Sequence, residues 1–343
     1  MKNKTIAVDL AKNVFEIGVS DRPGHVEKTY RLSRVKFLRF FVNREPATVL
    51  MEACGSAHHW GRQIRELGHE VKLISPQYVR PYVPRNKTDR ADVKGLLEAY
   101  RNSDICPVPI KTMAQQQLTA LHRIRSTWMG TRITRINMVR GLLREFGYVI
   151  PVGARHLVPG VMGLIEDAEI EIPSVVREML DQVCGEIREL ESHLRSVERE
   201  LEALAQQTPV VERLRSIPGI GLLTATAMVG FVGDIQRFRS SRQFASYLGL
   251  TPRERSSGNQ RRLGRISQRG DRYLRTLLIH GGRSLLWTAH KTKNPSPLQK
   301  WGLRIHELRG HNKAVVALAN KLARRVWAVW KRDCDYQANY RAA

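Results

Sequence analysis

A repeat of apolar residues between positions 176 and 204 constrains the fold of this 343-residue chain more than any other feature. The residues recur at alternating spacings of four and three, which is the a/d pattern of a helix that packs along another helix. The pattern predicts a coiled coil, within or between chains; one amphipathic helix packed on its own domain is the alternative. The nine positions are Val176, Leu180, Val183, Ile187, Leu190, Leu194, Val197, Leu201 and Leu204.

Net charge divides the chain into three parts. There are 57 Lys and Arg against 32 Asp and Glu, which gives a formal charge of +25. Residues 1–164 carry +14 and residues 210–343 carry +19, whereas residues 165–205 carry −8. Such an excess indicates a polyanionic partner, because basic groups placed on phosphates release condensed counterions. A basic protein without any catalytic chemistry has the same composition.

Cysteine spacing and hydropathy exclude two other classes of protein. The four cysteines, Cys54, Cys106, Cys184 and Cys334, include no CxxC pair, so neither a structural zinc site nor a disulfide framework is expected. Asp9 and Lys12 interrupt the apolar N-terminal stretch, which is therefore a poor signal peptide. The longest uncharged stretch, residues 217–233, is too short to span a bilayer comfortably. We expect a cytoplasmic protein, associated with the nucleoid, and no membrane partner.

The first 110 residues predict a mixed α/β domain. Three strands separated by short turns suggest an antiparallel meander, and alternating strands and helices follow. The expected strands are 5–9, 14–20, 26–31, 47–51 and 70–74, and the expected helices are 35–43, 58–67 and 88–100.

Two further domains are expected after this one. Residues 111–209 hold long helices, including one or two over 112–146, and the coiled coil. Residues 210–343 are mainly helical. Near their start, Pro218-Gly219-Ile220-Gly221 lies between helical segments, as in a helix-hairpin-helix module. The free backbone amides of such a turn can bind a DNA phosphate, so Pro218, Gly219 and Gly221 are candidate DNA-binding residues. An ordinary turn between core helices is the alternative.

Four carboxylates in the first domain form a candidate metal site. Asp9 and Glu52 lie at the ends of two expected strands, and Asp89 and Asp92 lie three apart on one face of an expected helix. Oxygen ligands suit Mg²⁺, and two such ions can assist both the attacking and the leaving oxygen in phosphoryl transfer. Each residue also has a structural interpretation: Asp89 as an N-cap, Asp92 in a first helical turn, and Glu52 at a strand end. Their combination in this order is typical of a ribonuclease-H-like fold.

The chain resembles the DEDD insertion-sequence transposases related to the Piv DNA invertases, which form the IS-one-ten family, and within them the IS-eleven-eleven subgroup. The resemblance covers nearly the whole chain in order, and its most specific motifs are Asn-Lys-Thr-Asp and Gly-Leu-Thr-Pro. The matching segments are residues 7–12, 51–55, 86–92, 217–221, 243–252 and 257–258.

The resemblance implies a RuvC-like N-terminal domain with Asp9, Glu52, Asp89 and Asp92 as its metal ligands, a coiled-coil middle and a C-terminal transposase domain. It also implies a nucleophilic serine, which the motif alignment assigns to Ser257, with the adjacent Ser256 as its competitor. Members of the family use a structured non-coding RNA to choose both DNA sites, so a guide RNA is an expected partner.

Arginines are concentrated around this serine. Eight lie in residues 251–275, Arg275 included, in a segment rich in Ser and Gly, which predicts a loop. Guanidinium groups match phosphate geometry, so the loop could follow a DNA backbone; a solvated basic loop is the alternative. The candidate DNA-binding residues here are Arg253, Arg255, Arg261, Arg262, Arg265 and Arg269.

These observations predict a transposase that excises and inserts a mobile element by Mg²⁺-dependent strand exchange, with a covalent serine–DNA intermediate. The expected assembly is a homo-oligomer, a dimer or a tetramer, on DNA. One rival is a hydrolytic, RuvC-like nuclease that is selective for DNA structure and uses water instead of serine. The other is a non-catalytic nucleic-acid-binding protein with structural carboxylates.

Overall fold

The chain divides into two compact units in the computed structural model, which describes residues 4–22, 24–84 and 88–338. The first unit is Met1–Met113 and the second is Ala114–Ala343. Each unit has hydrophobic cores of its own. The finer boundaries expected at residues 110 and 209 stay predictions.

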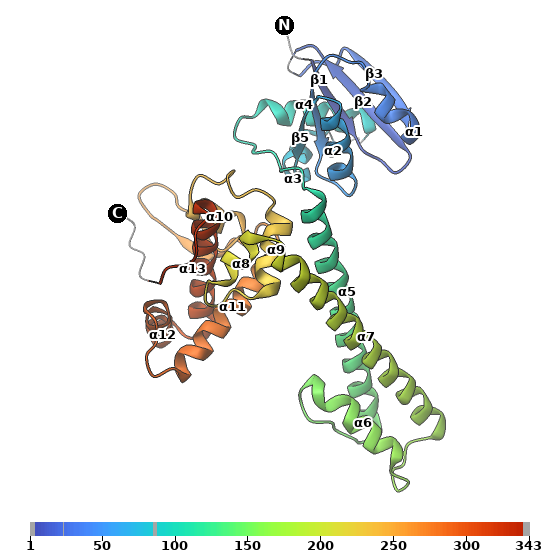
Figure 1. Cartoon of the computed structure of the whole chain (residues 1–343), viewed down its shortest axis with the longest axis vertical. Helices are drawn as coiled ribbons and strands as arrows, with labels where there is room; N and C mark the ends of the chain where they lie inside the picture. The colour runs from blue at the N-terminus through green and yellow to red at the C-terminus, as the bar shows by residue number, and fades with distance from the viewer. Residues whose placement is uncertain (1–3, 23, 85–87, 339–343) are drawn as a thin grey trace. The chain divides into compact units, whose positions relative to one another are not determined.

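A five-stranded mixed sheet organises the first unit (Figure 1). The strand order is β3-β2-β1-β4-β5, with β1, β2 and β3 antiparallel and with β4 and β5 parallel to β1. The expected meander is therefore present, although its third strand begins at Lys28 and not at Val26. Val26 instead packs against the buried cluster that contains Val93. The strands are β1 (Thr5–Asp9), β2 (Val14–Ser20), β3 (Lys28–Ser33), β4 (Thr48–Glu52) and β5 (Glu70–Ile74).

Helices cover both faces of this sheet. On one face, α2 places Trp60 and Ile64 against Phe15 and Phe37. On the other, α4 places Val93 and other apolar residues on Ala7 and Leu50 of the sheet. The helix expected over 35–43 is shorter, because a 3-10 turn (Leu38–Phe40) follows α1. The helices are α1 (Arg34–Phe37), α2 (Ala57–Glu66), α3 (Pro76–Val79) and α4 (Asp89–Arg101), and a second 3-10 turn spans Arg80–Tyr82.

Two long antiparallel helices begin the second unit. The first, α5 (Met113–Glu145), lies beside α7 (Ser174–Gln206), and ion pairs join Arg125 to Glu198, Arg132 to Glu191 and Arg135 to Glu186. A 3-10 turn (Ala154–His156) and α6 (Leu157–Glu166) connect them.

The a/d positions of the apolar repeat are all on α7, and the chain itself buries most of them. Leu180 and Ile187 belong to a core shared with α5 and α6, whereas Leu201 belongs to the core of the C-terminal helices. This supports packing within one chain over packing between chains. A supercoiled coiled coil in the strict sense stays a prediction.

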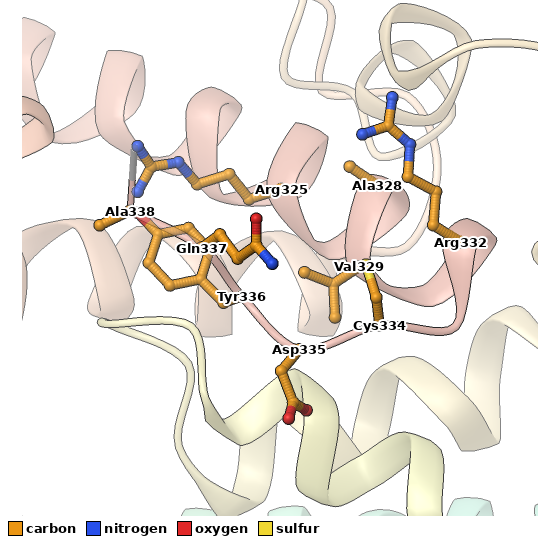
Figure 2. A pocket seen from close by; sticks show the side chains of 9 residues that line it. All are labelled: Arg325, Ala328, Val329, Arg332, Cys334, Asp335, Tyr336, Gln337 and Ala338. Carbon is orange, nitrogen blue, oxygen red and sulfur yellow. The ribbon is translucent and has the colours of Figure 1, made fainter. Parts of the chain in front are cut away.

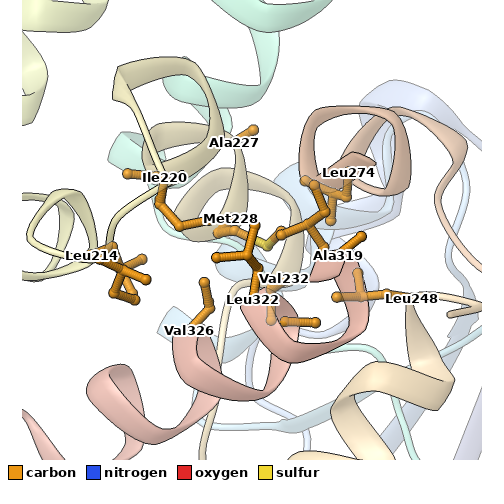
Figure 3. Packing of buried hydrophobic residues seen from close by; sticks show 14 of the residues in the cluster. Leu214, Ile220, Ala227, Met228, Val232, Leu248, Leu274, Ala319, Leu322 and Val326 are labelled. Carbon is orange, nitrogen blue, oxygen red and sulfur yellow. The ribbon is translucent and has the colours of Figure 1, made fainter. Parts of the chain in front are cut away.

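Six helices from α8 to α13 share one large apolar core with the end of α7 (Figure 3). Leu214, Met228, Leu274 and Leu322 meet there from four different helices. The elements are α8 (Pro209–Arg215), α9 (Leu222–Val232), α10 (Ser241–Tyr247), β6 (Pro252–Glu254), β7 (Leu263–Ile266), α11 (Arg272–Lys291), α12 (Pro297–Arg309) and α13 (His311–Arg332).

The last described residues fold back on this core. Asp333 forms an ion pair with Arg213, and the Tyr336 backbone N–H donates to the Ser216 hydroxyl at 3.0 Å. The Tyr336 ring lies 4.9 Å from the Arg325 guanidinium, beside a cavity of about 200 Å³ (Figure 2). The C-terminal segment therefore joins α13 to the start of the turn that contains Pro218.

Candidate metal centre and nucleic-acid interface

The sheet brings Asp9 and Glu52 to one edge. β1 and β4 are parallel, with Val8 opposite Met51, so Asp9 and Glu52 end neighbouring strands at the same level. Side chains alternate between the faces of a sheet, and Ala7 and Leu50 both pack under α4. Asp9 and Glu52 therefore lie on the α4 face, and both are only partly exposed.

Helix α4, which begins at Asp89, brings Asp92 to this face. Its N-cap is Thr88, whose side-chain oxygen accepts from the Ala91 backbone N–H at 3.2 Å. Asp89 is the first helical residue, so its interpretation as the N-cap is wrong. Asp92 lies in the first turn and lines a cavity of about 520 Å³ together with Glu52 and Arg80.

The oxygen-only donor set fits a hard divalent cation such as Mg²⁺. Asp92 and Glu52 face the same cavity, and Asp9 ends the strand next to Glu52. The Asp89 side chain lies outside the described residues, as do Asn86 and Lys87 of the same motif. Among the residues that the structure does describe, no three His, Cys, Asp or Glu groups are arranged to hold a metal ion. The metal site therefore stays a prediction.

Glu16 is a fifth carboxylate at this edge, and our sequence interpretation missed it. It pairs with Asp9 across β1 and β2, and on its other side with Arg31 of β3. Phe15 and Ile17 point to the opposite core, so Glu16 lies on the α4 face like Asp9. The sequence did contain an indication of Glu16, because it is a charged residue in a largely apolar strand, as Asp9 is. We call Glu16, Asp9 and Glu52 the carboxylate row.

The arginine-rich segment is a hairpin and not the expected loop. Strands β6 and β7 pair, the Arg255 backbone N–H donates to the Arg262 carbonyl at 2.9 Å, and α11 begins at Arg272. Arg275 lies inside α11, is 9% exposed and donates to the carbonyls of Leu248 and Arg269. The six candidate DNA-binding arginines are all exposed: Arg253, Arg255, Arg261, Arg262, Arg265 and Arg269.

The two adjacent serines differ in their hydrogen bonds. The Ser256 hydroxyl donates to Glu254 Oε1 at 2.7 Å and accepts from the Arg262 backbone N–H at 3.2 Å. Ser257 contributes its carbonyl to a turn, accepting from the Gln260 N–H at 3.2 Å, and Gly258 follows with a φ of +55°. Both serines are exposed. Ser256 is therefore oriented by a carboxylate, whereas Ser257 lies at the start of an open turn.

The turn over residues 216–221 connects α8 and α9, so helices flank it as expected. Gly219 has a φ of +90°, and a Cβ there would lie 2.9 Å from Leu285 and 3.1 Å from the Gly281 carbonyl oxygen. Pro218 and Gly221 are exposed, and Gly221 is the N-cap of α9 without a side-chain cap. Gly219 is therefore needed for packing on α11, while Pro218 and Gly221 are accessible.

No helix in the described part of the chain is long and apolar enough to cross a membrane.

Two family models match the chain, one mainly in the first unit and one in the second. A transposase model of the DEDD type matches residues 6–147, which include the strands that hold Asp9 and Glu52. The model described as "Transposase IS116/IS110/IS902 family" matches residues 211–295, from α8 through the arginine hairpin to the end of α11. These matches define a transposase, an enzyme that acts on DNA, and the DEDD match indicates dependence on divalent metal ions.

Similarity to curated relatives extends over nearly the whole chain. A probable family 20 transposase of Pseudomonas aeruginosa is 40% identical over 98% of this chain and 99% of its own length. The transposase of insertion sequence element IS1111A from Coxiella burnetii is 38% identical, with 97% and 91% covered. The transposase of IS1328 from Yersinia enterocolitica is 36% identical, with 96% and 97% covered. The chain belongs to the IS116/IS110/IS902 family of transposases.

Proposed function

We propose that this transposase excises and inserts a mobile element by Mg²⁺-dependent strand exchange through a covalent serine–DNA intermediate. The observation that supports this best is that Glu52 and Asp92 line one cavity on the face of the sheet under α4, with Asp9 at the end of the strand next to Glu52. Partly exposed carboxylates offer the oxygen ligands that hard divalent cations prefer.

In this proposal Asp9, Glu52, Asp89 and Asp92 hold two Mg²⁺ ions. When bound, such ions make the attacking oxygen more nucleophilic and stabilise charge on the leaving oxygen. The residues of the chain supply the negative charge that retains the ions and fix their position, because β1, β4 and α4 are rigidly packed through Ala7, Leu50 and Val93. The RuvC-like assignment of this unit belongs to the same proposal.

Ser257 is the proposed nucleophile. Its Oγ gives up its proton and forms a bond to phosphorus, while the bond from phosphorus to the 3′ or 5′ oxygen of the DNA breaks and that oxygen takes up a proton. The energy of the phosphodiester is kept in the serine–DNA bond, so a second strand can be joined without an external energy source. Ser256, hydrogen-bonded to Glu254, is the alternative nucleophile and otherwise orients the turn.

Nucleic acid would bind the arginine hairpin and the turn that contains Pro218, Gly219 and Gly221, as in a helix-hairpin-helix module. The six exposed arginines suit a phosphate backbone. A structured non-coding RNA that chooses the DNA sites, and a dimer or tetramer of the chain, complete the proposal. Both rest on the resemblance of the chain to its family; RNase treatment that leaves the rate and the choice of sites unchanged would exclude the RNA.

Removal of single carboxylates tests the metal site. Asp9→Asn and Glu52→Gln should each abolish recombination of a labelled element, and EDTA should do the same to the wild-type protein. The matched control is Asp104→Asn, because Asp104 is an exposed aspartate of the same unit. Full recombination by Asp9→Asn, or strong activity in EDTA, would refute the proposal.

Trapping the covalent intermediate tests the serine. Labelled DNA is incubated with wild type, Ser257→Ala and Ser256→Ala and is run on denaturing gels with and without protease. A slow, protease-sensitive band is expected for wild type and Ser256→Ala only. Its loss in Ser256→Ala but not in Ser257→Ala would move the nucleophile by one residue. Cleavage by the wild type without any such band would establish the hydrolytic nuclease instead.

A further inference from the structure

A cationic segment follows the outer edge of the first unit's sheet. Residues 28–44 contain six Lys and Arg side chains and no Asp or Glu. The segment comprises β3, α1 and the following 3-10 turn with the residues after it. We call it the cationic edge; its charged residues, all exposed, are Lys28, Arg31, Arg34, Lys36, Arg39 and Arg44.

Arg31 and Arg34 of the cationic edge lie at the same end of the sheet as the carboxylate row, whereas Lys28 lies at the other end of β3, opposite Val19. Arg31 is opposite Glu16, which is opposite Asp9, and two such strand steps span roughly 10 Å. The Arg34 backbone N–H donates to the Asn13 carbonyl at 2.9 Å, so α1 begins against the loop that follows β1. A phosphate held by Arg31 would therefore lie within about one Debye length of Asp9 at 0.1 M salt.

Protection of an exposed strand edge does not account for the whole set. Lys and Arg on edge strands discourage pairing with other chains, and Lys28 and Arg31 are on β3. The other four cations are on helical turns or after them, where no strand edge is exposed. The absence of acids over all 17 residues points instead to a polyanion.

The aromatic rings of the cationic edge are engaged inside the protein. The Arg44 guanidinium lies 3.8 Å from the centre of the Phe40 ring, and Tyr30 packs edge-on against Phe40 at 5.1 Å. Arg34 covers Trp60 at 4.9 Å. Unpaired bases bind by stacking on open aromatic faces, whereas a duplex presents phosphates and keeps its bases stacked inside. The surface therefore favours a duplex over a single strand.

We infer that the cationic edge binds the phosphate backbone of duplex DNA and directs it toward the carboxylate row. The inference requires that the protein binds DNA, as a transposase does, and it does not require the metal ions, the serine or the RNA. Its failure is therefore distinguishable from failure of the strand-exchange chemistry. Because phosphates carry no sequence information, the contribution should be the same for any duplex.

The experiment measures the salt dependence of DNA binding by the full-length protein. Fluorescence anisotropy with a mixed-sequence DNA duplex compares wild type with Arg31→Gln/Lys36→Gln. The control, Lys4→Gln/Arg65→Gln, removes the same charge at the opposite end of the sheet, where Lys4 precedes β1 and Arg65 lies in the last turn of α2 near Glu70. All four residues are exposed, so circular dichroism and the urea midpoint should be unchanged.

Each lost phosphate contact lowers the slope of log K against log salt by about 0.9. Arg31→Gln/Lys36→Gln should therefore lower the slope by about 1.8 and weaken binding up to about 60-fold at 0.1 M salt, while the control pair changes both much less. Equal losses in the two variants, or an unchanged slope in the first, would overturn the inference. A larger loss with single-stranded DNA or an RNA duplex than with duplex DNA would also overturn it, by assigning the surface to that partner.

Discussion

A buried histidine in the second unit should make the protein sensitive to mild acid. His122 of α5 is fully buried, and its Nε2 lies 2.9 Å from the Thr226 hydroxyl of α9 and its Nδ1 2.9 Å from the Tyr273 hydroxyl of α11. The Thr226 hydroxyl donates its hydrogen to the Leu222 carbonyl at 2.7 Å, so it accepts from Nε2–H. Nδ1 then accepts from Tyr273, and the imidazole is neutral.

The magnitude follows from the pKa. Burial, with a smaller contribution from the nearby Arg125, lowers the pKa of His122 from 6.5 to about 4. Above pH 6.5 the imidazole is neutral in both the folded and the unfolded state and adds no pH dependence. Between pH 6.5 and pH 4 the unfolded chain binds the proton and the folded chain does not. The free energy of unfolding therefore decreases as the pH is lowered through this range. A pKa difference of this size corresponds to about 3 kcal/mol.

Urea unfolding followed by tryptophan fluorescence measures this loss. Wild type and His122→Phe are compared at several pH values between 7.5 and 4. His122→Phe should be less stable at pH 7.5, because it leaves Thr226 and Tyr273 without their partner. From there to pH 4, wild type should lose about 3 kcal/mol more stability than the variant.

The control is His59→Gln, which removes an exposed imidazole and should keep the wild-type pH dependence. Parallel curves for wild type and His122→Phe across the whole range would refute the reasoning, because they would show that His122 does not resist protonation in the folded protein.

Four other substitutions, one of them a control, test the contacts of the second unit by the same urea measurements. Gly219→Ala should cost about 1–3 kcal/mol, because of its positive φ and its contact with α11, whereas Gly221→Ala meets nothing within 4 Å and should cost well under that; equal costs would contradict the packing. Ile187→Ala should cost about 2–5 kcal/mol because Ile187 is 1% exposed in the core shared by α5, α6 and α7, and a loss under 1 kcal/mol would place that face in solvent. Arg132→Gln should cost at most about 1 kcal/mol, because its ion pair with Glu191 is only partly buried, and a much larger loss would show a stronger role in joining α5 to α7.

The periodicity of apolar residues in the sequence was enough to predict the main secondary-structure elements. Alternation predicted β2 within its observed bounds, and the heptad repeat predicted α7, because one buried face imposes the period of its element. Charge distribution indicated a polyanionic partner, and the strand-end carboxylates, with the motifs that resemble the family, indicated a transposase; comparison with known proteins showed that membership. These features can be recognised in one sequence because each depends on residues that are close together along the chain.

Long-range pairing was beyond the sequence. The position of Glu16 beside Asp9 became known only with the register of β1 and β2, because the sequence of one strand does not determine which residue of the neighbouring strand lies opposite. The arginine segment was expected to be a loop because it is rich in Ser and Gly. Strands as short as β6 and β7 are not recognisable in such a composition. The repeat on α7 was equally compatible with a partner chain or its own, and only the ion pairs and cores shared with α5 decided that it packs within the chain. In each case the same local sequence pattern is compatible with several long-range contacts, and only the tertiary structure shows which contact forms.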